Sequence, residues 1–245
     1  MKLSKLLPLA LAAALAVCVI TPAKAGVIVA WDAKSANTTL ANATSTTLDS
    51  NLAGPVNLTL GSGFTPNSVG NTFGGSGTVD TSSGMASANS NGTYWQFTLT
   101  PASGYQVQVD SVVVPANYDV TQSHGLFTSQ DNPSTIINLA SSSDSFGSSL
   151  GSASVTALGA DAGYFTINLS APFITSSAVT LRLLISENFS WKTVGLQPDN
   201  YWDPVLQHNA LEINGSVTAV PEPSTCAMLL PAMGGILMML RRRRD

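Results

Sequence analysis

Residues 93–114 read TYWQFTLTPASGYQVQVDSVVV. In each half of this stretch, apolar and polar residues alternate with the period of two that a half-buried strand requires. The PASG at 101–104 carries the proline and glycine of a turn, so we expect the two halves to form a hairpin. The residues expected to face the core are Trp95, Phe97, Leu99, Tyr105, Val107, Val109 and Val113.

The rest of the segment from 26 to 219 repeats this pattern in short apolar runs separated by Gly, Pro, Asn and Ser. Many short strands of this kind predict an all-β fold, an antiparallel β-sandwich with jelly-roll-like connectivity. The Ser/Gly/Asn-rich stretches at 61–90 and 141–154 are expected to be surface connections, and no amphipathic helix is expected. Further strands are expected at 27–31, 56–60, 125–128, 135–139, 163–169, 178–186 and 210–218.

One of these strands, residues 179–186, reads VTLRLLIS and indicates which way its side chains point. Val179, Leu181, Leu183 and Ile185 would face the core. Arg182 would then lie on the outer face as a solvated sheet residue, with an acidic partner as an alternative. We do not expect it to clamp a ligand.

The low content of charged residues limits which classes of partner the chain can bind. Charged residues make up 10% of the chain, against roughly 25% in an ordinary soluble protein. Between residues 26 and 220 the cations are Lys34, Arg182 and Lys192. Nucleic acid is therefore not an expected partner, because phosphate binding needs clustered Lys or Arg. Both cysteines lie in the apolar terminal segments, so neither disulfides nor thiolate metal sites are expected in the folded body.

Residues 1–25, MKLSKLLPLALAAALAVCVITPAKA, have the three parts of a secretory signal peptide. Two lysines precede an apolar run at 6–20, and small residues occupy Ala23 and Ala25. Signal peptidase would cut after Ala25 and leave Gly26 as the first residue of the exported chain. We therefore expect export through the inner membrane.

Residues 220–245 read VPEPSTCAMLLPAMGGILMMLRRRRD. The apolar stretch at about 226–240 predicts a single C-terminal transmembrane helix, although its 15 residues span roughly 22 Å of a ~30 Å hydrocarbon core. The basic residues that follow resist translocation, so the C-terminus would stay cytoplasmic. These residues are Arg241, Arg242, Arg243 and Arg244.

The order of Pro221-Glu222-Pro223, an apolar segment and a terminal arginine run resembles the PEP-CTERM sorting signal of Gram-negative bacteria. The resemblance implies processing by exosortase, an integral membrane protease, near the Pro-Glu-Pro motif. It also implies a transient membrane anchor, followed by release or transfer to the cell surface or extracellular matrix. The chain would thus divide into a signal peptide (1–25), a β-sandwich ectodomain (26–219) and a sorting signal (220–245).

Catalysis is not expected, although a Gly-x-Ser-x-Gly pattern occurs at 147–151, GSSLG. Asp161, Asp199 and His208 follow it in the order of a hydrolase triad. A nucleophile elbow needs a strand before the serine and a helix after it, and the flanking residues predict no helix. A secreted hydrolase therefore stays the weakest alternative, and we assign no catalytic residue.

Metals and cofactors are not expected either. His124 and His208 are far apart in sequence and lack a second ligand at zinc spacing. Calcium remains an alternative at polar turns such as Asp199-Asn200 with Asp203, or around Asp131, but no calcium-binding motif is present. Polar turn residues are the simpler interpretation.

Aromatic residues late in the chain suggest a ligand surface. Trp191, Tyr201 and Trp202 lie near Lys192 and Asp203 in the sequence, a combination that suits stacking on sugar rings. Capping of one end of the sandwich by Trp191 and Trp202 is the simpler interpretation. Our leading hypothesis is a noncatalytic cell-surface or matrix protein associated with exopolysaccharide. A carbohydrate-binding module that uses these aromatics is the first alternative.

Overall fold

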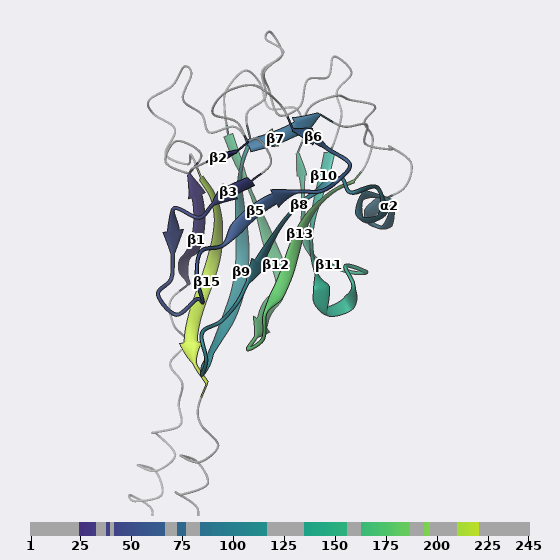
Figure 1. Cartoon of the computed structure of the whole chain (residues 1–245). Coiled ribbons are helices and arrows are strands. Elements are labelled where there is room, and N and C mark those ends of the chain that lie inside the picture. The colour runs from purple at the N-terminus through teal and green to yellow at the C-terminus, as the bar shows by residue number, and fades with distance from the viewer. Residues whose placement is uncertain are drawn as a thin grey trace, which may run out of the picture.

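The computed structural model describes residues 25–32, 38–39, 42–66, 73–76, 84–116, 135–155, 163–186, 194–196 and 210–220. Within these ranges the chain is mostly β-strand, with little helix (Figure 1). The expected strand at 125–128 lies outside them. The elements are β1 (Gly26–Asp32), β2 (Thr38–Thr39), β3 (Asn42–Thr44), β4 (Thr47–Leu48), β5 (Asn57–Leu60), β6 (Thr65–Pro66), β7 (Phe73–Ser76), α2 (Gly84–Asn91), β8 (Tyr94–Leu99), β9 (Tyr105–Ala116), β10 (Thr135–Ser141), η2 (Ser142–Asp144), β11 (Ser149–Val155), β12 (Gly163–Thr175), β13 (Val179–Ser186), β14 (Val194–Leu196) and β15 (Ala210–Ala219).

The long strands form two antiparallel sheets. Sheet I has the order β12-β9-β15-β1-β4, and sheet II has the order β11-β10-β13-β8-β5-β3-β2. A small third sheet has the order β14-β7-β6. The first long strand, β1, and the last, β15, are neighbours in sheet I, so the two ends of the described body meet in one ladder.

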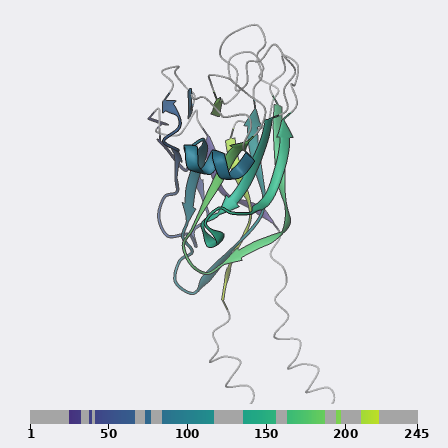
Figure 2. The same cartoon turned by 90° about the vertical axis from the view of Figure 1, so that its right-hand side faces the viewer.

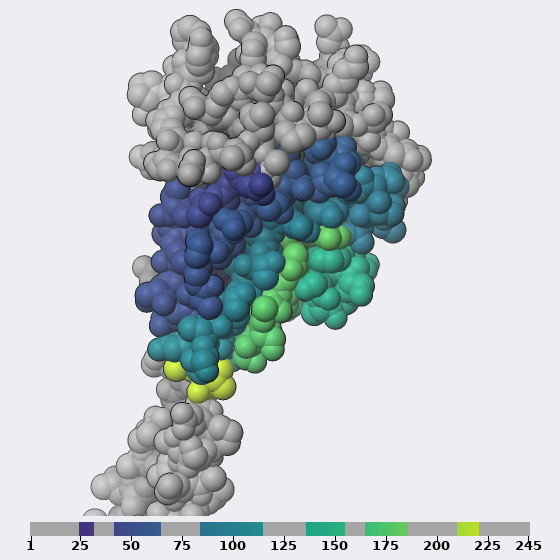
Figure 3. All heavy atoms as spheres, viewed as in Figure 1, coloured from purple at the N-terminus to yellow at the C-terminus, as the bar shows by residue number. Residues whose placement is uncertain are grey.

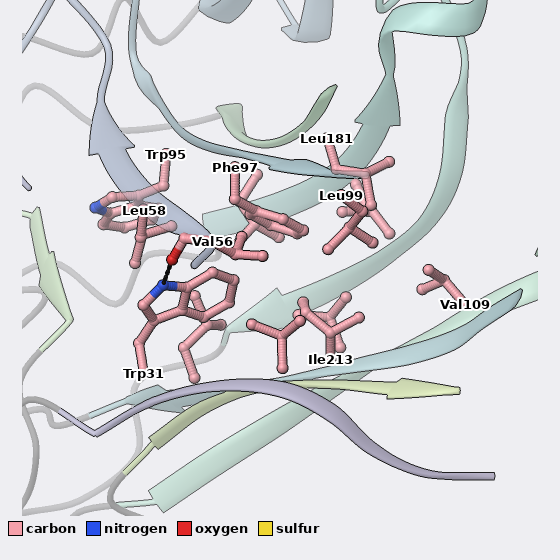
Figure 4. Packing of buried hydrophobic residues seen from close by; sticks show 14 of the residues in the cluster. Trp31, Val56, Leu58, Trp95, Phe97, Leu99, Val109, Leu181 and Ile213 are labelled. Atoms are coloured by element: carbon pink, nitrogen blue, oxygen red, sulfur yellow. Dashed lines mark hydrogen bonds between the residues drawn. The ribbon is translucent and has the colours of Figure 1, made fainter. Parts of the chain in front are cut away.

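One hydrophobic core lies between the two large sheets and takes side chains from both (Figure 4). Trp31 and Ile213 come from sheet I, while Leu58, Phe97 and Leu181 come from sheet II. The rings of Trp31 and Phe97 lie 5.1 Å apart across this core, and the Trp31 indole N–H donates to the carbonyl of Val56 at 3.0 Å. Burying aromatic and aliphatic side chains of this size is the dominant favourable term in folding.

The segment 93–114 joins the two sheets instead of forming the expected hairpin. β8 belongs to sheet II and pairs with β13 and β5, whereas β9 belongs to sheet I and pairs with β12 and β15. The hairpin prediction was therefore wrong, although both strands exist. The turn between them is tied to another loop, because Ala53 N–H donates to Thr100 O and Ala102 N–H to Asn51 O, both at 2.8 Å.

The core-facing pattern of β9 changes part-way along the strand. Asp110 is skipped in the register with β15, which marks a β-bulge. Beyond this extra residue the side-chain parity reverses, so Val112 and Val114 join the core. Val113 is buried without belonging to that cluster, so placing it on the core face was wrong.

The strand directions define two different ends of the molecule. At one end, here called the tail end, β1 begins and β15 finishes (Figure 1). The short turns 100–104 and 176–178 join strands at this same end. At the opposite end, here called the loop end, the chain leaves β1, β9, β11 and β13 and returns into β10, β12 and β15. The connections 117–134, 156–162 and 187–209 therefore start and finish at the loop end.

Both stretches expected to be surface connections contain regular structure. The first contains the helix α2, which lies against β13 of sheet II (Figure 2). Its C-terminus is capped by Gly92 at φ +74°, with Thr93 N–H donating to Ala88 O at 2.9 Å. The second contains η2 and the strand β11. Serine-rich composition concealed these elements because tertiary packing, not propensity, stabilises them.

Candidate functional sites: the tail junction and the loop end

The junction with the C-terminal tail lies at the tail end of sheet I. β15 finishes at Ala219, and the next residue, Val220, donates its backbone N–H to Gly104 O at 2.8 Å. Pro221 follows and has no N–H to donate, so it cannot continue the ladder in this way. The last described hydrogen bond therefore precedes the Pro-Glu-Pro sequence directly.

The expected signal-peptidase site lies at the same end. Ala25 is exposed, and Gly26 opens β1 as the cross-strand partner of Gly215. A Cβ built on Gly26 would meet no atom within 4 Å, so the backbone here is uncrowded. Ala23 lies outside the described residues, and the cleavage itself stays a prediction. Both expected processing points thus flank one pair of neighbouring strands (Figure 3 shows the tip of β15 in yellow).

A family model described as the PEP-CTERM protein-sorting motif matches residues 219–244. The chain carries a PEP-CTERM protein-sorting motif. This motif is a signal for processing by exosortase, and it marks the chain as a protein sorted to the cell surface. No curated protein and no solved structure matches the sequence.

The residues predicted to act in the PEP-CTERM signal fall within the matched range. They lie outside the described residues, so their individual roles remain predictions. They are Pro221, Glu222, Pro223, Arg241, Arg242, Arg243 and Arg244.

The predicted membrane segment at about 226–240 also lies outside the described residues. In the part of the chain that the structure describes, neither helix is long and apolar enough to cross a membrane.

The Gly-x-Ser-x-Gly pattern at 147–151 does not have the structure of a nucleophile elbow. Ser149 opens β11, so a strand follows the serine where the elbow needs a helix. Its hydroxyl donates to Gly151 O at 2.9 Å, two residues further along the same strand. The prediction that no helix follows is confirmed. Asp161, Asp199 and His208 lie outside the described residues.

The turn that precedes this pattern is ordered by the carboxylate of Asp144. It accepts the backbone N–H of Ser148 at 2.9 Å, the Ser148 hydroxyl, and the Gly147 N–H at 3.3 Å. These donors favour the ionised form, and the Ser148 hydroxyl above all holds the pKa of Asp144 below its ordinary value of 3.8. Ser145 and Phe146 both have positive φ, 60° and 63°, a backbone strain that turns the chain sharply here.

This strained turn helps to enclose Arg182, whose guanidinium lies between two aromatic rings. Its central carbon is 3.9 Å from the ring centroids of both Tyr94 and Phe146. Nε donates to Gln96 Oε1 at 3.1 Å and Nη1 to Asn89 Oδ1 at 2.5 Å. Arg182 does lie on the outer face, as predicted. Among the described residues, however, its hydrogen-bond and ring partners are amides and aromatic rings and not an acid.

A second, smaller apolar cluster surrounds this arginine on the outer face of sheet II. It consists of Ala88, Ala140 and Leu184, with Met85, Tyr94 and Phe146 packed against it. Sequence reasoning missed this cluster. The available signal was Leu184, which breaks the alternation of VTLRLLIS by placing a large apolar residue on the expected outer face.

The candidate sugar-contacting residues Trp191, Tyr201 and Trp202 lie outside the described residues. The segment that carries them leaves β13 at Ser186 and enters β15 at Ala210, both at the loop end. His124, Asp131, Asp199 and Asp203 also lie outside the described part. Within that part, no group of three or more His, Cys, Asp or Glu side chains could hold a metal ion.

Proposed function

We propose that this chain is an exported, noncatalytic protein of the cell surface or extracellular matrix that associates with exopolysaccharide. Export would begin with signal-peptide removal before Gly26. Sorting would follow through the PEP-CTERM tail, anchored by the helix at about 226–240 until exosortase cuts near Pro221-Glu222-Pro223. No catalytic residue, metal or cofactor is part of the proposal.

We further propose that the ectodomain is a jelly-roll β-sandwich. The support is the strand order, in which β12-β9-β15-β1 of sheet I and β11-β10-β13-β8 of sheet II are the two four-stranded halves of that topology. In this interpretation, β2 to β7 and α2 form one long insertion between the first and second jelly-roll strands. Within this insertion, β2, β3 and β5 extend sheet II, β4 extends sheet I, and α2 covers part of the outer face of sheet II.

The observation that carries the proposal is the opposite placement of the tail and the long connections. The tail leaves β15 at the tail end, whereas the connections after β1, β9, β11 and β13 leave from the loop end. A domain tethered through residue 220 would therefore present the loop end away from the membrane. That orientation suits a protein that contacts extracellular material and not the lipid surface.

Carbohydrate binding is the second candidate, and the position of one segment favours it. Residues 187–209 carry Trp191, Tyr201 and Trp202 and join two strands at the loop end. Aromatic faces suit stacking on the apolar C–H patches of sugar rings, beside which carboxylates and amides can bond the hydroxyls. A small set of such rings would give a weak, repeatable contact with a polymer.

Fractionation tests the sorting proposal. Intact mass spectrometry of protein from membranes and from extracellular matrix should find a matrix form that begins at Gly26 and ends near Pro223. The variant Glu222→Ala, or deletion of the four terminal arginines, should remain unprocessed in the membrane. Normal delivery of these two variants would contradict the proposal.

Glycan binding is tested separately with Trp202→Ala and its neighbour Tyr201→Phe as the matched control. We expect Trp202→Ala to lose retention on the exopolysaccharide of the host, while Tyr201→Phe keeps the ring and binds. The urea midpoint of both variants should match that of the unaltered chain. Unfolding of Trp202→Ala would show that this residue belongs to the core.

A further inference from the structure

The last strand of the domain extends beyond its neighbour at the tail end. β15 pairs with β1 only as far as Gly215, which faces Gly26. On its other side, β15 continues to pair with β9 as far as Ala219, which faces Tyr105. The four residues Ser216, Val217, Thr218 and Ala219 therefore have a partner strand on one side only among the described residues (Figure 1). We call them the overhang.

The direction of each backbone group in the overhang follows from one hydrogen bond. Val220 N–H donates to Gly104 O at 2.8 Å, so residue 220 forms a hydrogen-bonded pair with β9. Such pairs alternate along an antiparallel ladder, which makes Thr218 and Ser216 the next residues bonded to β9. The N–H and C=O groups of Val217 and Ala219 then point to the opposite side, where β1 has not yet begun.

This free edge lacks the features that usually protect an edge strand. Proteins block such edges with charged residues, proline or a bulge, whereas the overhang reads SVTA and contains none of these. The side chain of Val217 packs against the core, and the Thr218 hydroxyl accepts a hydrogen bond from Gln106 Nε2 at 3.4 Å. The overhang is therefore fixed in position by the core and by β9. Within the described part of the chain it is an uncharged strand whose edge beside β1 has no partner strand.

The edge also lies directly beside the sorting motif. Ala219 is two residues before Pro221, and both prolines of the motif lack an N–H. Five residues, 221–225, separate Val220 from the predicted membrane segment, and an extended chain covers at most about 18 Å over that length. A membrane-bound protease that cuts in this interval must therefore work within reach of the overhang.

We infer that the overhang docks the sorting protease by β-strand addition, with a strand of exosortase pairing along Val217 and Ala219 while the motif enters its active site. This inference rests on the proposed sorting function. Backbone pairing of this kind supplies affinity without side-chain specificity, which suits a segment of small, uncharged residues. The folded domain is then part of the recognised substrate, in addition to the tail.

Covering the edge from within the chain tests this inference without altering the overhang or the motif. Continuing the register of Gly26 with Gly215 brings the position before Gly26 opposite Ser216. A Thr-Val-Thr-Val insertion between Ala25 and Gly26 would lengthen β1 along the whole overhang. A Gly-Gly-Pro-Gly insertion of equal length is the control, because its proline lies opposite Val217, where it cannot donate to the ladder.

In the host, we expect the Thr-Val-Thr-Val chain to be processed about tenfold more slowly than the control, since it hides the two donors that the protease would use. The readout is a pulse-chase assay of full-length and cleaved chain. Hydrogen exchange should show Val217 and Ala219 amides protected only in the Thr-Val-Thr-Val chain. As a second variant, Ala219→Pro should slow processing while Ala219→Ser does not.

Equal processing rates of the two insertion chains, with the Val217 and Ala219 amides protected as designed, would overturn the inference. Glu222→Ala separates this failure from failure of the sorting function. If Glu222→Ala blocks processing while the covered edge has no effect, only the docking inference falls. If Glu222→Ala is also processed normally, sorting through the tail is wrong and the inference falls with it. Protection of the edge amides that rises with protein concentration would assign the edge to a second copy of this chain instead.

Discussion

The outer faces of the two sheets differ, although both sheets contribute to the same core. On sheet I the outward side chains at the tail end of β9 and β15 are polar and bond to one another, as when Gln106 Nε2 donates to Thr218 Oγ1 at 3.4 Å. On sheet II, α2 and the turn 142–148 cover part of the face and enclose Leu184 and Arg182. A strand whose outer face is bare needs only apolar residues alternating with polar ones. A strand whose outer face is covered also needs apolar residues at the outward positions of this alternation.

The largest effect is expected where the backbones of sheet I approach most closely. A Cβ on Gly215 would lie 1.9 Å from the backbone oxygen of Gln108, and the two residues belong to strands that pair in one ladder. Gly215→Ala should lower the free energy of unfolding by about 3 kcal/mol because the strands must separate locally. Urea unfolding measures this loss. Gly26→Ala, on the cross-strand partner, is the control and should change the value by less than about 0.5 kcal/mol.

Truncation of Leu184 tests whether the covered face is a true second core. This side chain is 0% exposed although it points away from the main core. Leu184→Ala should cost about 2–3 kcal/mol in the same assay, as for other buried leucines. Gln106→Ala, on the bare face of sheet I, should cost almost nothing. Equal costs for the two variants would remove the distinction between the faces.

Arg182 allows a finer test of how the covered face is held. Arg182→Lys keeps the positive charge but loses the planar group that fits between Tyr94 and Phe146, so we expect a loss of about 1–2 kcal/mol. A double-mutant cycle with Phe146→Ala should give a coupling of about 0.5–1 kcal/mol. Additive losses would mean that the stacked geometry contributes nothing beyond packing.

The smallest effect concerns the turn 142–148 and depends on pH. Because the folded pKa of Asp144 is lowered, its contribution is fully present above the ordinary value of 3.8 and is lost as the pH falls through the folded pKa. Hydrogen exchange of the Gly147 and Ser148 amides should accelerate at acidic pH beyond the intrinsic trend. Asp144→Asn should show faster exchange already at pH 7 and no further acid dependence of this kind. Identical protection in both proteins would exclude the carboxylate as the organiser of the turn.

Alternation predicted the buried faces of the strands where the strands are regular. Trp95, Phe97 and Leu99 are all buried, as their spacing indicates. The same alternation failed for Val113, because the extra residue Asp110 shifts the phase and nothing in a local pattern marks it. The local sequence pattern also could not show which strands pair with one another. A turn between two strands is compatible with a hairpin and equally with a connection between two sheets.

The covered face escaped prediction for a different reason. α2 reads GMASANSN, a sequence with little helical preference that is helical here because Ala88 packs on Leu184 and Ala140. The enclosure of Arg182 depends on Phe146, which is far away in sequence and, like Ser145 before it, has a positive φ. The sorting signal, in contrast, could be predicted from the sequence, because its three parts follow one another along the chain and depend on no contact.

The position of β15 links folding to the order in which the chain is exported. In the proposed export, β15 is the last strand of the described body to cross the inner membrane, yet it lies in the middle of sheet I, between β9 and β1. Until residues 210–219 emerge, the first strand has no central partner, and the pairing that completes the sheet joins positions almost 190 residues apart, such as Gly26 and Gly215. Such distant pairing is slow to form. The PEP-CTERM motif, at residues 219–244, follows this closing strand directly along the chain. A chain that ends before residue 210 would lack both the closing strand and the sorting motif, so incomplete folding and failed sorting would occur in the same molecules.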